Sequence, residues 1–155
     1  MPTIHYSKTN YSFVLIGCMF LIILGIGISY LYQWGSPPMS LASTIIIAVF
    51  FIGIILLMYQ LKITIDDRKI SIRVGVGLIK KTILLKDIDI DSMKKVSIPW
   101  YYGIGIRLTQ YGMLYNVKSG DALLIHSKNK QRSILIGTKD ANKLMNIILQ
   151  LNKQN

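Results

Sequence analysis

Two long apolar runs near the amino terminus dominate the pattern of this chain. Positions 9–61 contain no Lys, Arg, Asp or Glu. Within this stretch, residues 11–32 and 41–60 are each long enough to cross the roughly 30 Å hydrocarbon core of a bilayer as a helix rising about 1.5 Å per residue. The segment 33–40 between them holds a glycine and two prolines, which interrupt a helix. The pattern predicts two transmembrane helices joined by a short external turn.

Small residues recur at a spacing of four on both apolar runs. Gly25 and Ser29 lie on the first, and Thr44 and Ala48 on the second. In an antiparallel hairpin Ser29 would lie level with Thr44, and Gly25 with Ala48, and small residues let helix backbones approach closely in lipid. We therefore expect these four residues to form the helix contact, although chance spacing in a run rich in Ile and Gly would look the same.

After position 60 the apolar residues alternate with polar ones, as they do in half-buried strands. Residues 69–74 show the clearest case, with Ile70, Ile72 and Val74 on one face. Turn residues such as Asp66-Asp67 divide the alternating segments. The strands expected on this basis cover 62–65, 69–74, 78–85, 88–98, 104–108, 112–117, 122–127 and 132–136.

The chain ends on a helical pattern. Asp140 can cap a helix, and Leu144, Ile147, Ile148 and Leu151 follow the spacing of one buried stripe. Seven or eight short strands followed by one amphipathic helix predict a mainly-β, α+β domain over residues 61–155, with the helix covering an open end. Residues 1–10 are expected to be a short, mobile amino-terminal segment.

The charge distribution indicates how the helices are oriented. The chain has a net charge of +11, and Lys8 alone of its 18 basic residues precedes the second apolar run. The turn at 33–40 has none, so the positive-inside rule places both termini and the basic domain in the cytoplasm. A basic domain held there is expected to lie near anionic headgroups. Charge alone would also suit nucleic acid, or serve only solubility.

The reactive side chains form no pattern typical of an enzyme or a metal site. Cys18 is the only cysteine and lies in an apolar run, and His5 and His126 have no neighbouring carboxylate pattern. Gly103-Ile-Gly105 lacks the third glycine and the following helix of a dinucleotide-binding loop. We expect no catalytic residue, cofactor, metal or small-molecule substrate.

Two segments of the domain are candidates for binding a surface or a partner. An aromatic loop after Pro99 could insert into headgroups, or could cover one end of the domain. A basic cluster follows the strand at 122–127, and could equally be a solvated hairpin tip. The candidate residues are Trp100, Tyr101, Arg107, Lys128, Lys130 and Arg132.

Several motifs in residues 60–151 resemble bacterial membrane proteins that carry a pleckstrin-homology-like domain. They are Tyr102-Gly-Ile-Gly-Ile-Arg107, Gly112-Met-Leu-Tyr-Asn-Val117, Ala122 to Ile125 and Ile136-Gly-Thr-Lys-Asp140. Ala141 stands where the family often has proline, and Met113 where it has an aromatic residue. The resemblance implies a small β-barrel of about seven strands capped by a carboxy-terminal helix, and it does not imply an enzyme.

These observations predict a multi-pass protein of a bacterial cytoplasmic membrane. Its function would be non-enzymatic: a basic pleckstrin-homology-like domain presented at the membrane surface to lipid headgroups or to a membrane protein, including a second copy of the chain. The alternative is an accessory or assembly subunit of a membrane complex, in which the domain binds protein and its charge is incidental. No nucleic-acid partner is expected.

Overall fold

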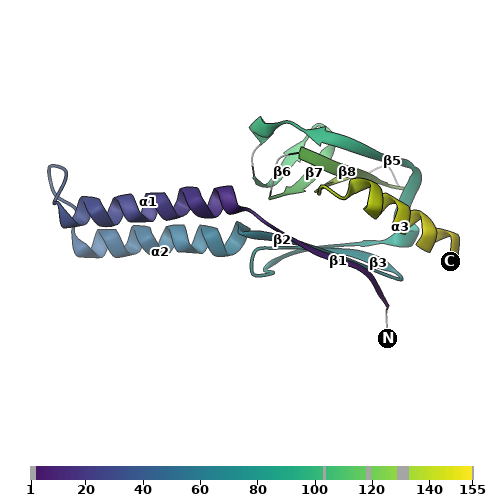
Figure 1. Cartoon of the computed structure of the whole chain (residues 1–155), viewed down its shortest axis with the longest axis horizontal. Coiled ribbons are helices and arrows are strands. Elements are labelled where there is room, and N and C mark those ends of the chain that lie inside the picture. Colours follow the sequence, from purple (N-terminus) through teal and green to yellow (C-terminus); the bar gives the residue numbers. More distant parts are fainter. Residues whose placement is uncertain (1–2, 103, 118–119, 129–132, 155) are drawn as a thin grey trace.

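The computed structural model of the chain describes residues 3–102, 104–117, 120–128 and 133–154. These residues form a helical hairpin and a domain of two sheets and one helix (Figure 1). The elements are β1 (Ile4–Tyr11), α1 (Phe13–Leu31), α2 (Leu41–Met58), β2 (Gln60–Asp66), β3 (Lys69–Val74), β4 (Ile79–Leu84), the 3-10 turn η1 (Leu85–Asp87), β5 (Ile88–Ile98), the 3-10 turn η2 (Trp100–Tyr102), β6 (Gly105–Thr109), β7 (Gly112–Asn116), β8 (Gly120–Ser127), β9 (Ser133–Gly137) and α3 (Ala141–Gln154).

The two predicted apolar helices are confirmed. Helices α1 and α2 have 19 and 18 residues, and both are long and apolar enough to cross a membrane. Neither contains a buried residue, so each presents apolar side chains around most of its circumference. A core helix of a water-soluble domain would instead bury one apolar stripe. The helices are slightly shorter than the expected spans, because Tyr11 and Gln60 belong to strands.

The strands form two open sheets rather than the closed barrel that the family resemblance implied. Sheet A has the order β1-β2-β3-β4, and sheet B has the order β5-β8-β9-β7-β6. All neighbours are antiparallel except β7 and β9, which run parallel. The chain passes from sheet A to sheet B through η1, and no ladder joins β4 to β5 in the part of the chain that the structure describes. The α+β class is retained, and the barrel closure is corrected.

The amino-terminal segment is part of the domain, which corrects the expectation of a mobile tail at 1–10. Strand β1 pairs with β2 from Ile4↔Asp66 to Tyr11↔Gln60. The helical hairpin is therefore inserted between two neighbouring strands of sheet A, with β1 running into α1 and α2 running into β2 (Figure 1). The end of the domain at which these connections lie is called the hairpin end below. The far end carries the β2–β3 turn.

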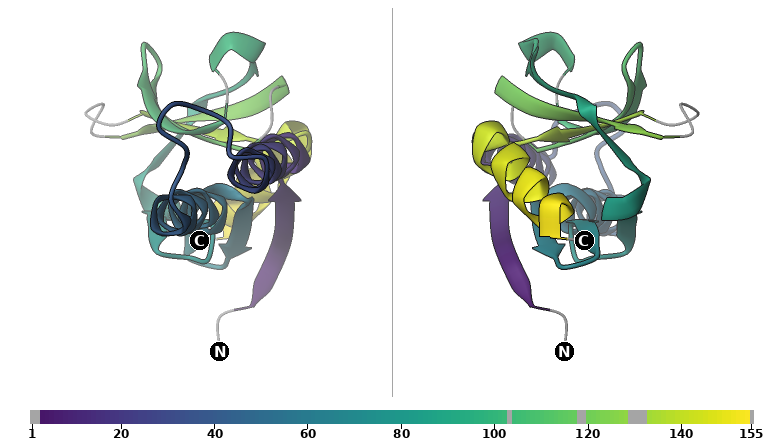
Figure 2. Two further views of the ribbon diagram at one scale, coloured as in Figure 1. Left: turned by 90° about the vertical axis from the view of Figure 1, so that its left-hand side faces the viewer. Right: turned by 90° about the vertical axis from the view of Figure 1, so that its right-hand side faces the viewer.

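The main core lies between the inner faces of the two sheets and α3. The inward residues of β3 are Ile70, Ile72 and Val74, as the alternation predicted. Helix α3 buries Leu144, Ile148 and Leu151 in the same cluster. Figure 2 shows α3 beside β1, along the side of the domain where sheet A ends. The amphipathic stripe of α3 thus covers an open side of the two-sheet structure.

Sheet B also buries residues on its other face. Leu114, Leu124 and Leu135 form a small cluster there, and Tyr102 of η2 packs against it. Tyr101 stacks edge-on against Tyr102, with ring centroids 5.1 Å apart, and is itself exposed. One tyrosine of the aromatic loop therefore covers sheet B, and the other faces outward.

Candidate functional site

The helical hairpin joins sheet A without a flexible linker. Ser12 is the single residue between β1 and α1, and its backbone N–H donates to the Tyr59 carbonyl at 2.9 Å. The rings of Tyr11 and Tyr59 lie 6.3 Å apart on the two connections. Because both connections belong to one hydrogen-bonded ladder, the direction of the helices fixes the orientation of sheet A.

The β3–β4 turn packs against the last turn of α2. The Val76 N–H donates to the Leu56 carbonyl at 2.9 Å, and the Gly75 N–H donates to the Gln60 carbonyl at 2.8 Å. Gly75 has φ +59°, and a Cβ at this position would lie 2.2 Å from the Leu57 carbonyl oxygen. Only glycine permits both the backbone conformation and this close approach.

The same end of the domain exposes large apolar side chains. Val76 and Leu78 of the β3–β4 turn are 53% and 76% exposed, and Tyr101 in η2 is 65% exposed. The start of β6 also lies here, since a Cβ at Gly105 would be 3.6 Å from Sδ of Met58, the last residue of α2. The hairpin end thus exposes apolar side chains from both the β3–β4 turn and η2.

A row of cations crosses the outer face of sheet A, close to this end. The register places Lys62 opposite Arg73, and Arg73 opposite Lys80, on three neighbouring strands. All three side chains are exposed, and they form no ion pair with any residue that the structure describes. Like charges directly opposite each other destabilise a sheet. We call these three residues the cation row.

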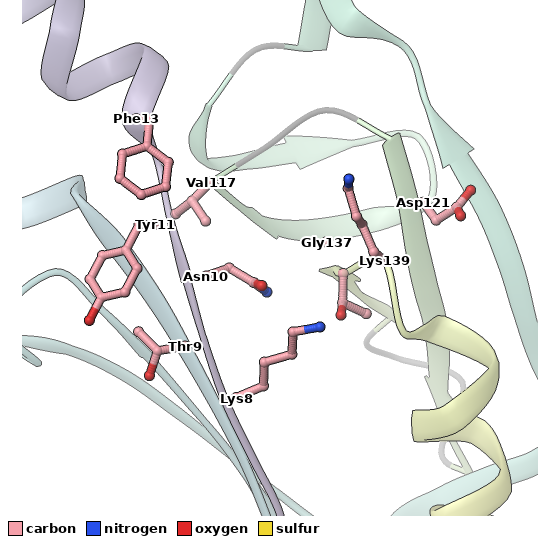
Figure 3. A pocket seen from close by; sticks show the side chains of 10 residues that line it. Lys8, Thr9, Asn10, Tyr11, Phe13, Val117, Asp121, Gly137 and Lys139 are labelled. Carbon is pink, nitrogen blue, oxygen red and sulfur yellow. The ribbon is translucent and has the colours of Figure 1, made fainter.

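A cavity of about 310 Å³ opens along the inner side of β1, between the two sheets. Figure 3 shows Lys8 and Asn10 pointing into it from β1, and Lys139 on the opposite wall. Phe13, the first residue of α1, lies at its end nearest the helices (Figure 3). The cavity has a mixed lining, and one of its lysines is already paired.

The paired lysine of the cavity is Lys8, and its contact joins β1 to the start of α3. The Lys8 ammonium and the Tyr6 hydroxyl, the latter at 3.1 Å, both donate to Oδ2 of Asp140. The Lys8 hydrogen bond holds the pKa of Asp140 below its ordinary value. Burial, followed by the hydrogen bond to Asp140, raises the pKa of Tyr6 to about 12. Asp140 precedes α3 as predicted, and its carboxylate serves chiefly to fasten the helix to sheet A.

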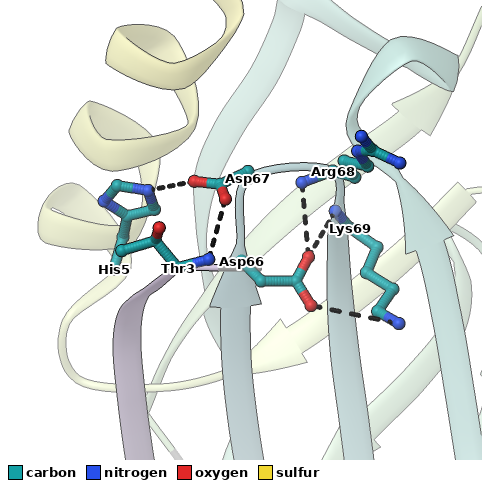
Figure 4. Close-up of polar contacts among 6 residues, drawn as sticks. All are labelled: Thr3, His5, Asp66, Asp67, Arg68 and Lys69. Atoms are coloured by element: carbon teal, nitrogen blue, oxygen red, sulfur yellow. Dashed lines mark hydrogen bonds and ion pairs between the residues drawn. The ribbon is translucent and has the colours of Figure 1, made fainter. Parts of the chain in front are cut away.

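Polar contacts at the far end fasten the start of β1 to the β2–β3 turn (Figure 4). The Thr3 N–H donates to Asp67 at 2.8 Å, and the His5 ring nitrogen lies 2.6 Å from the same carboxylate. These two contacts, the Thr3 hydrogen bond first, lower the pKa of Asp67. In the turn itself Asp66 accepts from the Lys69 N–H at 2.9 Å. His5 is therefore part of a strand contact and not of a mobile terminus.

The predicted binding residues do not form one surface. Tyr101 is exposed near the hairpin end, and Arg107 is exposed midway along β6. Lys128 lies at the far end, where its N–H donates to the Asp87 carbonyl at 2.8 Å. The side chain of Trp100 and the residues Lys130 and Arg132 lie outside the described part of the chain. The structure thus separates the aromatic loop from the start of the predicted basic cluster.

Sequence reasoning missed the cation row. Lys62, Arg73 and Lys80 occupy outward positions of three strands, so each looks like an ordinary solvent-facing residue. Only the register brings them side by side. The alternation in residues 69–74 indicated the face of Arg73, but no local signal indicates its neighbours.

The expected contact between small residues of the helices stays a prediction, and Gly25 shows no close approach to α2. This residue is exposed, and a Cβ built there would meet nothing within 4 Å. Ser29, Thr44 and Ala48 are half-buried, and their pairing stays a prediction.

Comparison with known proteins identifies no relative for this arrangement. A scan against protein-family models, a search of curated proteins and a search of solved structures each found no match. Among the described residues, no group of three His, Cys, Asp or Glu side chains is placed to hold a metal ion. A functional argument therefore depends on the geometry of the hairpin end.

Proposed function

We propose that this protein is a non-enzymatic interaction module of a bacterial cytoplasmic membrane, which holds its basic domain against anionic phospholipid headgroups. The observation that carries the proposal is the insertion of the helical hairpin between β1 and β2. If the hairpin spans the bilayer, the hairpin end of the domain must face the lipid. A domain on a flexible tether would have no such fixed face.

The orientation follows from the charges that flank the helices. Lys8 precedes α1, and Lys62, Arg68 and Lys69 follow α2, whereas the α1–α2 connection has no basic residue. By the positive-inside rule, both termini and the domain are cytoplasmic. The cytoplasmic leaflet carries a negative surface potential, and each Lys or Arg near it contributes about 1 kcal/mol of attraction.

The likeness to a bacterial pleckstrin-homology-like domain belongs to this proposal. Two open sheets with a carboxy-terminal helix along one side are compatible with it. The parallel pairing of β7 and β9 is a departure from a simple antiparallel meander. The lipid hypothesis rests on the cations and on the placement of the helices, and does not require the family assignment.

The test is the lipid preference of the full chain in vesicles. Spin-labelled phosphatidylglycerol and phosphatidylcholine are compared for the fraction that is motionally restricted by the protein. We expect phosphatidylglycerol to be preferred at low ionic strength and the preference to fall as salt is raised, because salt screens exposed charges. Equal restriction of both lipids at low salt would contradict the proposal.

The second candidate function is that of an accessory subunit of a membrane complex, and one observation favours it. The β6–β7 hairpin forms an edge of sheet B, and Leu108 is 78% exposed there, opposite the partly exposed Met113. Ile104 and Ile106, at alternate positions before it, pack against the core, whereas Leu108 is exposed. Exposed apolar residues on an edge strand suit a protein partner that adds to the sheet.

Crosslinking in native membranes separates this candidate from the lipid hypothesis. A protein that co-purifies with the wild-type chain and is lost with Leu108→Lys would support a partner at β6. Retention of the same protein with Leu108→Lys would count against that edge as its binding surface.

A further inference from the structure

We propose that the β3–β4 turn enters the cytoplasmic leaflet beside α2, and that the cation row binds lipid phosphates directly above it. This inference rests on the proposed membrane function and adds the surface that performs it. The turn supplies Val76 and Leu78, and the row supplies Lys62, Arg73 and Lys80.

The length of α2 sets the depth of the turn. At about 1.5 Å per residue, its 18 residues span roughly 27 Å, slightly less than a hydrocarbon core of about 30 Å. The whole of α2 must then lie within the core. Val76 is hydrogen-bonded to Leu56, two residues before the end of α2, so the backbone of the turn reaches the inner boundary of the core.

The backbone of the turn is suited to this depth because three of its amides and one of its carbonyls are paired within the protein. Three consecutive amides, those of Gly75, Val76 and Gly77, donate to the carbonyls of Gln60, Leu56 and Val74 at 2.8–3.0 Å. The Gly75 carbonyl accepts from the side-chain amide of Gln60 at 2.9 Å. Irregular backbone is tolerated at membrane depth only where its polar groups find partners within the protein. The Leu56 carbonyl benefits equally, since it would otherwise lack a partner at the helix end.

The side chains of the turn fit the same environment. Val76 and Leu78 expose most of their surface beside Leu56 and Leu57, which are themselves exposed on α2. The turn and the last turn of α2 thus expose apolar side chains at the same end of the domain, and exposed apolar patches mark binding surfaces. The end of an apolar helix makes lipid acyl chains the occupant that fits, rather than a protein.

The backbone of the cation row then lies just outside the headgroup layer, within reach of its long side chains. Arg73 is three residues before Val76, or roughly 10 Å along an extended strand at about 3.3 Å per residue. The polar headgroup layer is about 5–8 Å thick beyond the hydrocarbon boundary. Long Lys and Arg side chains reach such phosphates while their stems lie on the sheet. Anionic phosphates between the three cations would also relieve their mutual repulsion.

Spin labels on the full chain test the insertion. In a Cys18→Ala background, single labels are placed through Val76→Cys, Leu78→Cys and, as the control at the far end of sheet A, Arg68→Cys. We expect labels at the first two sites to be more accessible to oxygen than to a water-soluble nickel chelate, and the label at Arg68 to show the reverse. Leu78 is the more exposed of the two test sites, so its replacement leaves the core intact. Nickel accessibility at both test sites equal to that at Arg68 would overturn the insertion.

Charge removal tests the phosphate contact. The triple variant Lys62→Gln, Arg73→Gln and Lys80→Gln is compared with Arg68→Gln, Lys86→Gln and Lys153→Gln, which removes the same charge from exposed positions away from the hairpin end. We expect the preference for phosphatidylglycerol to fall by up to roughly five-fold for each cation removed from the row. The control variant should keep most of the preference for phosphatidylglycerol.

The outcomes separate this inference from the proposed function. Equal losses in the two triple variants, with the wild type preferring anionic lipid, would overturn the cation row as the binding surface and leave the proposed function standing. No preference in the wild type would overturn the proposed function itself, whatever the labels report.

Discussion

Gly75 lies where the β3–β4 turn passes closest to α2. Its positive φ and the carbonyls of Leu56 and Leu57 leave no space for a side chain. Gly77, two residues further on, also has a positive φ of +95°, but a Cβ there would meet nothing within 4 Å. A side chain at Gly77 would therefore cause backbone strain alone, whereas a side chain at Gly75 would cause both backbone strain and a steric clash with α2.

This difference predicts unequal effects of the same substitution. Gly77→Ala should lose roughly 1–3 kcal/mol of stability through backbone strain alone. Gly75→Ala should lose more, because the turn must also move away from α2. Thermal unfolding of both variants in detergent gives the comparison. Equal losses would show that the contact with α2 contributes nothing to stability.

The cation row predicts a gain in stability when a charge is removed. Lys80→Thr removes one of the two like charges that lie opposite Arg73 on the neighbouring strands. Threonine also suits a strand. The variant should be more stable in neutral detergent by roughly 0.2–1 kcal/mol. Lys86→Thr, outside the row, is the control and should change little. A less stable Lys80→Thr variant would mean that the row is not repulsive.

At the scale of elements, the attachment of α3 to β1 depends on Asp140. Asp140→Asn removes the charge that Lys8 and Tyr6 contact. Because both ion-pair partners are partly exposed, the loss should be about 0.5–1 kcal/mol. Hydrogen exchange should increase in α3 and β1 together. Asp87→Asn, an exposed position on η1, provides the control.

The contact between Asp140 and Lys8 also makes the stability of the protein depend on pH. The pKa of Asp140 is lowered in the folded state, so its stabilising effect is complete above the ordinary aspartate pKa of 3.8 and is lost as the pH falls below it. The free energy of unfolding of Asp140→Asn should therefore be lower than that of the wild type at neutral pH. It should also fall less steeply below about pH 4. An identical slope in wild type and variant would show that Asp140 is not the responsible group.

The elements that could be predicted from sequence are those whose burial matches a simple period. Helices α1 and α2 are apolar throughout, β3 alternates, and α3 carries one stripe, so each was recognised. Strand β1 was missed because its inward residues include Lys8 and Asn10, which line the cavity and hide the alternation. Lys8 is tolerated there because Asp140 pairs with it, and that contact joins residues 132 positions apart. The pairing of strands, and hence the open sheets and the cation row, has no local signal either.

At the scale of the whole molecule, the helical hairpin interrupts a sheet rather than preceding a domain. The start of the chain and the strand after α2 are neighbours over seven pairs of residues. The domain therefore cannot assemble its first sheet until both helices have been made. A fragment that begins after α2 lacks one edge of sheet A, together with the Lys8 and Tyr6 contacts to α3.

This topology predicts how a water-soluble form of the domain can be made. Tyr11 and Gln60 are directly paired, so replacing residues 12–59 with Asn-Gly would join β1 and β2 by a two-residue turn of the type that suits antiparallel strands. This chain should give a dispersed amide spectrum and one cooperative thermal transition. The fragment 60–155 should be less stable or aggregate, because the edge of β2 is left unpaired and the core loses Tyr6. Equal stability of the two forms would show that β1 is not a structural part of the domain, and would return the amino-terminal segment to the role of a tail.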